Sequence, residues 1–105
     1  MIYRENNDGK GISYMHTIKK GTNQLYIGDT EEEAIAKITF IPEGDKLIAN
    51  HTFVSEQLRG QGIAKKLTEE LVAHAKEENK KIVPECSYVE VFMKRYKEHQ
   101  AVFVK

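Results

Sequence analysis

The spacing of the apolar residues changes once along this chain, and that change constrains the fold more than any other feature. Up to Val54 the apolar and polar residues alternate as in β-strands, most clearly over residues 33–41. One face of that segment carries Ala34, Ala36, Ile38 and Phe40. From Gly62 to Asn79 the apolar residues recur every three or four positions, as in an amphipathic helix. A strand-rich half leading into a long helix predicts an α+β domain.

Four strands are expected before the helix. They span residues 12–18, 24–27, 33–41 and 47–54. The first two predict a hairpin around a turn at 19–23. The composition of Pro42-Glu43-Gly44-Asp45 predicts the turn between the last two. Ile35 and Ile41 interrupt the polar face of the third strand, so we expect that face to be partly covered.

The second half of the chain continues with a short strand at 81–83 and a shorter helix over 88–97. A strand, a helix and a further strand form a crossover, so strand 81–83 should lie parallel to strand 47–54. Residues 101–104 form a final strand or a tucked tail. The sheet is therefore expected to be mixed and mostly antiparallel. Residues 1–105 should make a single domain, with 1–20 as a peripheral lead-in.

Composition excludes several classes of function. The 105 residues carry 16 Lys and Arg against 16 Asp and Glu, so a nucleic-acid or membrane partner is not expected. The first residues hold no apolar run typical of a signal peptide, and no stretch reaches the length of a membrane helix. A single cysteine, Cys86, fits a reducing cytoplasm. The four scattered histidines show no metal-ligand spacing.

Two glycines, Gly60 and Gly62, stand where the long helix begins. Glycine allows a tight turn and a close approach of backbone to ligand, and the first turn of a helix offers free amides to an anion. Arg59 and the Lys65-Lys66 pair would add positive charge. The spacing matches neither a Walker A loop nor a Rossmann fingerprint. A phosphate site and a plain turn before a packed helix both remain open on the glycines alone.

The wider string Gln57-x-x-Gly60-x-Gly62, between a strand and a helix, resembles the signature of the GNAT superfamily of acetyl-CoA-dependent N-acetyltransferases. The resemblance implies a minimal GNAT-like fold with acetyl-CoA or coenzyme A as its ligand. The backbones of Phe53 and Val54 would then contact the pantetheine arm. The pyrophosphate would be bound by Gln57, Leu58, Arg59, Gly60, Gln61, Gly62, Ile63 and Ala64.

A narrower resemblance links three motifs in order. His51-Thr52-x-Val54, Leu58 to Leu67 and Pro84-x-Cys86-Ser87-Tyr88-Val89 together are similar to the small YjdJ-type acetyltransferases. This similarity runs from about residue 25 to residue 96. Larger GNAT members have two helices between their first two strands, which build much of the acceptor pocket. Here only a short turn is available, so the acceptor side should be open or completed by a partner.

Three residues are candidates for the chemistry of acetyl transfer. Cys86 should lie at the start of the second helix, where its thiol could accept the acetyl group transiently or protonate the departing thiolate. A buried structural role is the alternative. His51 is a base near neutral pH or a half-buried histidine bonded to backbone. Tyr88 is a possible proton donor, while Tyr96 is expected to pack in the core.

The expected activity is transfer of acetyl from acetyl-CoA to an amine, on a small molecule or a protein. The alternatives are a non-catalytic CoA or acyl-CoA-binding module and a protein-interaction module. The open side makes a homodimer possible. The acceptor itself is not encoded in any motif of this chain.

Overall fold

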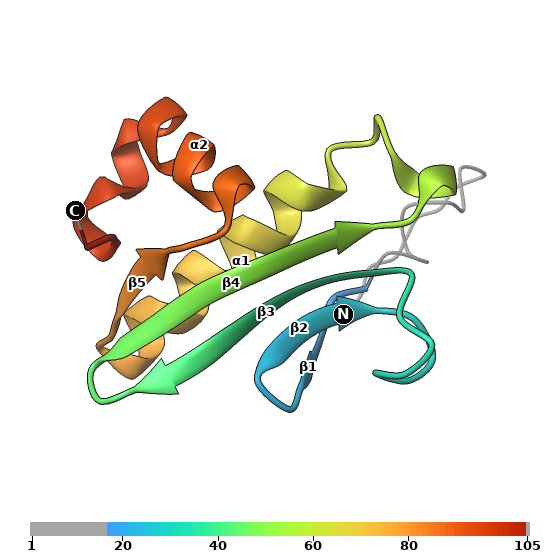
Figure 1. Ribbon diagram of the computed structural model, residues 1–105, viewed down its shortest axis with the longest axis horizontal. Coiled ribbons are helices and arrows are strands. Elements are labelled where there is room, and N and C mark those ends of the chain that lie inside the picture. The colour runs from blue at the N-terminus through green and yellow to red at the C-terminus, as the bar shows by residue number, and fades with distance from the viewer. Residues whose placement is uncertain (1–16, 105) are drawn as a thin grey trace.

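The computed structural model describes residues 17–104. Its strands form one sheet in the order β1-β2-β3-β4-β5 (Figure 1). The strands are β1 Lys19–Gly21, β2 Gln24–Ile27, β3 Ala36–Glu43, β4 Lys46–Val54 and β5 Lys81–Pro84. The first four strands pair antiparallel, and β4 pairs parallel with β5, as the crossover predicted. The mixed α+β architecture is confirmed.

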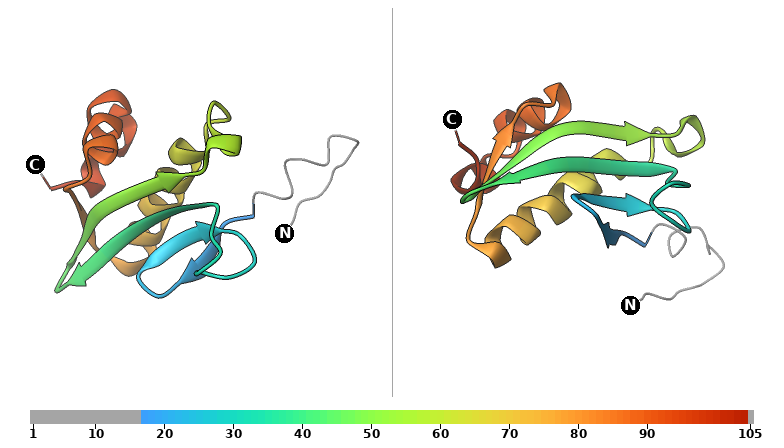
Figure 2. Two further views of the ribbon diagram at one scale, coloured as in Figure 1. Left: turned by 45° about the vertical axis from the view of Figure 1, so that its right-hand side comes forward. Right: turned by 60° about the horizontal axis from the view of Figure 1, so that its bottom comes forward.

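Within the described residues, two α-helices and two short 3-10 helices accompany the sheet. They are η3 Glu56–Leu58, α1 Ile63–Glu78, α2 Ser87–Arg95 and η4 Lys97–Val102. α1 crosses one face of the sheet, and α2 packs beside it against β4 and β5 (Figure 2). Within residues 17–104 no helix combines the length and apolarity needed to cross a bilayer.

The long helix forms where its apolar spacing predicted it. Ile63, Leu67 and Leu71 are almost fully buried against the sheet, and each such side chain contributes roughly 1.5–3 kcal/mol by leaving water. The helix ends at Asn79, whose left-handed backbone (φ 58°) is a conformation that asparagine tolerates. Lys65 and Glu69 form an ion pair along the exposed side, at 3.9 Å.

The turn predicted at residues 19–23 is shorter in the structure. Lys19–Gly21 forms an edge strand, and only Thr22 and Asn23 make the turn to β2. Glu31, from the following loop, accepts hydrogen bonds at 3.0 Å from the Thr22 amide and the Gln24 side chain. The strand expected at 12–18 lies mostly outside the described residues. Contacts from a distant glutamate, rather than local propensity, fix this hairpin.

β3 begins later and runs further than its alternation predicted, since it includes Pro42 and Glu43 and leaves Gly44 and Asp45 as the turn. β2 has already ended at this point, so the missing N–H of Pro42 costs the sheet no hydrogen bond. Of the two residues expected on a partly covered face, Ile35 is half-buried and packs against the core, whereas Ile41 is 48% exposed.

The C-terminal segment closes the core. Val89 and Phe92 of α2 are buried, and Phe92 stacks on His99 with ring centroids 5.7 Å apart. Val102 and Phe103 are buried as well, and Phe103 forms a single parallel bridge with Ile82 of β5. The tail is therefore tucked against the sheet edge rather than added as a full strand.

Candidate functional site

A β-bulge in β4 shapes the site. Ala49 lies opposite Phe40, but His51 lies opposite Thr39, so Asn50 is an extra residue without a partner in β3. The Thr39 hydroxyl donates a hydrogen bond to Asn50 Oδ1 over 2.7 Å and holds the bulge in place.

The bulge reverses which side chains face α1. Beyond it, Thr52 lies opposite the buried Ile38, so Thr52 and Val54 face the helix side of the sheet. His51 and Phe53 face the opposite side, where both side chains are exposed. Without the extra residue these two pairs would exchange faces.

The two parallel strands part at the same level. The amides of Glu85 and Cys86 both donate to the carbonyl oxygen of Ala49, at 3.1 and 2.8 Å. Ala49 and Pro84 form the last pair in the register of β4 with β5. From Asn50 onward, β4 therefore has one edge that β5 does not cover.

The free edge is presented by alternate residues of β4. The Ser55 amide donates to the Ile35 carbonyl at 2.9 Å, on the β3 side. Because peptide groups alternate along a strand, those of Phe53 also face β3, while those of Thr52 and Val54 face the free edge. Of the two backbones predicted to contact pantetheine, Val54 lies on this edge and Phe53 does not.

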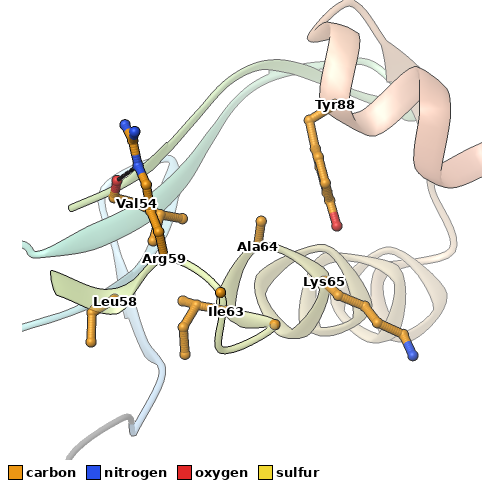
Figure 3. Close-up of a pocket in the computed structure, with 9 residues that line it drawn as sticks. Val54, Leu58, Arg59, Ile63, Ala64, Lys65 and Tyr88 are labelled. Atoms are coloured by element: carbon orange, nitrogen blue, oxygen red, sulfur yellow. Dashed lines mark hydrogen bonds between the residues drawn. The ribbon is translucent and has the colours of Figure 1, made fainter. Parts of the chain in front are cut away.

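A cleft of about 240 Å³ opens beside this edge (Figure 3). It lies between the end of β4, the glycine loop and the first turns of α1 and α2. Its lining residues are Val54, Leu58, Arg59, Gly60, Gly62, Ile63, Ala64, Lys65 and Tyr88. Most of the residues predicted to bind the cofactor are thus brought together. Gln57 and Gln61 are not part of the lining, and the Gln61 side chain donates instead to the Gln57 carbonyl at 3.2 Å.

The loop geometry depends on its two glycines. Gly60 (φ 85°) and Gly62 (φ 72°) have left-handed backbones that side chains other than glycine adopt at a cost. A Cβ at either position would meet no atom within 4 Å. The glycines therefore serve the turn of the backbone and leave open space above it.

The N-terminus of α1 is electropositive. Lys66 makes the first helical hydrogen bond, to Gly62, so the amides of Ile63, Ala64 and Lys65 have no partner within the helix. No side chain caps this end, and its first turn contains no acidic residue. Free amides and the positive end of the helix dipole thus face the cleft together with lysine charge.

Lys65 and Arg59 are held at the two sides of the cleft. Lys65 Nζ lies 4.8 Å from the ring centroid of Tyr96, a cation–π contact. Arg59 Nε donates to the Val54 carbonyl at 3.3 Å (Figure 3). Tyr96 packs against the core, as expected, and in addition orients this lysine.

Cys86 lies at the point where the strands part. Its Sγ is 3.4 Å from the Thr52 hydroxyl. Burial alone would raise the pKa of the thiol, but hydrogen bonds from Thr52 and from the Val89 and Tyr88 amides outweigh it, so the Cys86 pKa is lowered. The cysteine does not line the cleft itself. Thr52, which contacts Cys86, lies on the same face of β4 as Val54, two residues further along the strand.

Tyr88 projects into the cleft from the first turn of α2 (Figure 3). Partial burial raises its pKa, and the neighbouring Tyr96 and Glu69 act in the same direction against the opposing charge of Arg95. The phenol therefore keeps its proton over a wider pH range than a free tyrosine.

The predicted chemical residues occupy three different places. Tyr88 lines the cleft, Cys86 lies beyond its lining at the parting of the strands, and His51 is on the opposite face of the sheet. Sequence reasoning missed Thr52 as a partner of Cys86. Strand alternation could not have found it, because the bulge at Asn50 is not visible in the residue pattern.

The fold has counterparts among known proteins. The sequence model of the GCN5-related N-acetyl-transferase family matches residues 24–102. The NMR solution structure of a GCN5-like candidate N-acetyltransferase from Staphylococcus aureus is similar over 86% of this chain and 89% of that one, with 38% identity and a TM-score of 0.72. No curated protein matches.

A more distant similarity concerns the fold alone. The crystal structure of a GNAT-family acetyltransferase from Staphylococcus aureus Mu50 aligns with 68% of this chain and 49% of its own, at 18% identity and a TM-score of 0.50. The chain therefore spans about half of that larger protein. From the family match over residues 24–102 and the 38% identical neighbour, this chain belongs to the GCN5-related N-acetyltransferase family.

Proposed function

We propose that this protein binds acetyl-CoA and transfers the acetyl group to an amine, as an acetyltransferase of the small YjdJ type. The observation that carries the proposal is the cleft at the N-terminus of α1, where free amides, Arg59 and Lys65 gather on an uncapped helix end. An uncapped end with cations in its first turn is unfavourable for the helix alone, and a bound anion would relieve it.

The pyrophosphate of coenzyme A fits the glycine end of the cleft. The backbone from Gly60 to Ala64 offers amides, and the empty space above Gly60 and Gly62 admits phosphate oxygens close to the chain. The pantetheine arm fits the free edge of β4, where the Thr52 carbonyl and the Val54 amide are available. The ligand would thus lie between β4 and α2, with its thiol end toward Cys86.

The chemistry of the proposal rests on the protonation states of two residues. Bound acetyl-CoA supplies an acetyl group on a thioester whose transfer leaves a thiolate. Tyr88 holds a proton that its raised pKa retains, and donates it to that thiolate. Two roles fit Cys86: its lowered pKa favours a nucleophile that carries the acetyl group transiently, and its position also suits a proton donor.

In this proposal His51 interacts with the acceptor amine. It is exposed on the face of the sheet opposite α1, where Phe53 is 39% exposed beside it. An amine approaching the parted strands from that face would meet the imidazole. In the part of the chain that the structure describes, the two-residue turn Thr22–Asn23 joins β1 to β2, which leaves the acceptor side to a partner or to the substrate itself.

Calorimetric titration with CoA and acetyl-CoA tests the ligand. The Gly60→Glu variant places a carboxylate where the pyrophosphate would lie and should weaken binding at least about tenfold. Gly60→Ala carries the same backbone strain without the charge, so it should weaken binding less than Gly60→Glu. The ligand proposal fails if folded wild-type protein binds neither compound.

A non-catalytic CoA-binding module is the second candidate, favoured by the absence of helices between β1 and β2. Release of free thiol from acetyl-CoA in the presence of amines separates the two. Binding without turnover over a panel of small and peptidyl amines would support the module. Cytoplasmic location and a homodimer belong to the proposal as well, and fractionation and light scattering test them.

A further inference from the structure

One side-chain contact spans the point where β4 and β5 part. Thr52 Oγ1 lies 3.4 Å from Cys86 Sγ, although the two residues are 34 positions apart in the chain. Both side chains are half-buried. The contact lies just beyond the Ala49 carbonyl, which accepts the last amides from the β5 end.

The contact depends on the bulge. Strict alternation from Ala49 would direct His51 and Phe53 toward α1 and turn Thr52 to the opposite face. The extra residue Asn50, fixed by the Thr39 hydroxyl at 2.7 Å, is what brings Thr52 to the side of Cys86. The bulge therefore places the Thr52 hydroxyl against the Cys86 sulfur.

We propose that Thr52 is a positioning residue whose hydroxyl donates a hydrogen bond to Cys86 Sγ and holds the sulfur at the point where β4 and β5 part, beside the cleft. This inference rests on the proposed function, in which Cys86 takes part in acetyl transfer. The side chain of Thr52 acts only through the cysteine.

The direction of the hydrogen bond follows from the chemistry of the pair. A thiolate has no proton to give, so the bond can then run only from Oγ1 to Sγ, and a charged acceptor makes it stronger. The amides of Val89 and Tyr88, at the start of α2, favour the same ionised form, and together with Thr52 they lower the Cys86 pKa.

Charged neighbours do not explain this shift. The elements around Cys86 carry titratable groups that include His51 of β4, Glu85, Tyr88 and Glu90 near and on α2, and Lys65 and Glu69 of α1. The causes that act on the Cys86 pKa are burial and hydrogen bonds, with no charged side chain among them. Removing the Thr52 hydroxyl should therefore move the pKa without a change in any charge.

The experiment measures the rate of alkylation of Cys86 by iodoacetamide as a function of pH. Cys86 is the only cysteine in the chain, so the reaction reports on one thiol. Thr52→Val keeps the shape of the side chain and removes the hydroxyl. Thr52→Ser keeps the hydroxyl and removes the methyl group, so it is the matched control.

In Thr52→Val the midpoint of the profile should rise by about one pH unit, with alkylation near pH 7 slower by up to about tenfold. Thr52→Ser should keep the wild-type midpoint. Equal midpoints in wild type and Thr52→Val would overturn the inference, and so would a shift of equal size in Thr52→Ser.

A second measurement guards against a loss of packing. Thr52→Ala leaves a smaller side chain at a half-buried position, and it should shift the midpoint as Thr52→Val does if the hydroxyl is the cause. In turnover assays Thr52→Val should lower kcat and leave the CoA Kd unchanged. The alkylation profile is measured without ligand. Failure of acetyl-CoA to bind would therefore refute the proposed function, while the effect of Thr52 on the Cys86 thiol could still be determined.

Discussion

Arg59 and Val54 are joined at the side of the cleft, where Arg59 Nε donates to the Val54 carbonyl oxygen over 3.3 Å. This carbonyl belongs to the free edge of β4. The arginine therefore covers a backbone acceptor and keeps its charge beside the glycine loop, within reach of an anion at the α1 N-terminus.

Replacing Arg59 by Met should weaken CoA binding about fivefold at low salt, because an exposed charge next to the phosphate groups is lost. The difference from wild type should shrink as salt is added. Arg59→Lys, which keeps the charge, is the control. Equal affinities of wild type and Arg59→Met in calorimetric titration at low salt would contradict a phosphate-binding role.

Gly28 and Gly44 offer a matched test of backbone strain. A Cβ at Gly28 (φ 148°) would lie 2.9 Å from the Ala34 Cα and the Glu33 carbonyl oxygen, whereas at Gly44 (φ 60°) it would meet nothing within 4 Å. Gly28→Ala should lower the free energy of unfolding by about 2–4 kcal/mol, and Gly44→Ala by about 1–2 kcal/mol. Denaturant titrations measure both, and an equal loss would contradict the close approach at Gly28.

Ionisation of Tyr88 should destabilise the protein at alkaline pH. Its folded-state pKa is raised above the ordinary value of 10.0, chiefly by burial, so the unfolded chain loses the proton first. Stability from this group is complete below that ordinary pKa and falls as the pH rises through it. Melting temperatures between about pH 9 and 11 should fall more steeply in wild type than in Tyr88→Phe. Parallel curves would count against a raised pKa.

The same variant tests the proton donor. Tyr88→Phe should lower kcat about a hundredfold while the Kd for CoA stays close to wild type. Tyr96→Phe is a suitable control, since Tyr96 packs against the core and does not line the cleft. An unchanged kcat in Tyr88→Phe would assign proton donation to another group.

Phe92 anchors α2 and hence the position of Tyr88. Its ring is buried and contacts the rings of Tyr96, His99 and Phe103. Phe92→Ala should reduce the free energy of unfolding by about 3–5 kcal/mol. Phe92→Leu fills more of the space and should cost clearly less. Chemical denaturation of the two variants gives the comparison, and equal losses would contradict an aromatic cluster at this position.

The long helix and the parallel crossover could be predicted because local signals agree with the fold. Ile63, Leu67 and Leu71 repeat at helical spacing and all three are buried, and Asn79 ends the helix as its residue type suggests. The glycine loop was recognisable as well, since left-handed backbones at Gly60 and Gly62 leave few other choices.

Features fixed by distant contacts could not be predicted. The edge strand at Lys19–Gly21 has charged residues and little strand propensity, and Glu31 ties down its turn from the next loop. The bulge at Asn50 depends on a hydroxyl in the neighbouring strand. Since a bulge reverses every side chain beyond it, the faces of His51 and Thr52 could be assigned only from the structure.

The Ala49 carbonyl accepts hydrogen bonds from two amides, and this arrangement has a consequence for the kinetics of ligand binding. The gap between β4 and β5 is set by strand register and by a bulge, which are parts of the folded sheet and not of a hinge. A ligand that binds there would not require the strands to separate first, so no rare open state would reduce its apparent affinity. Association should then follow a single exponential whose rate grows linearly with ligand concentration.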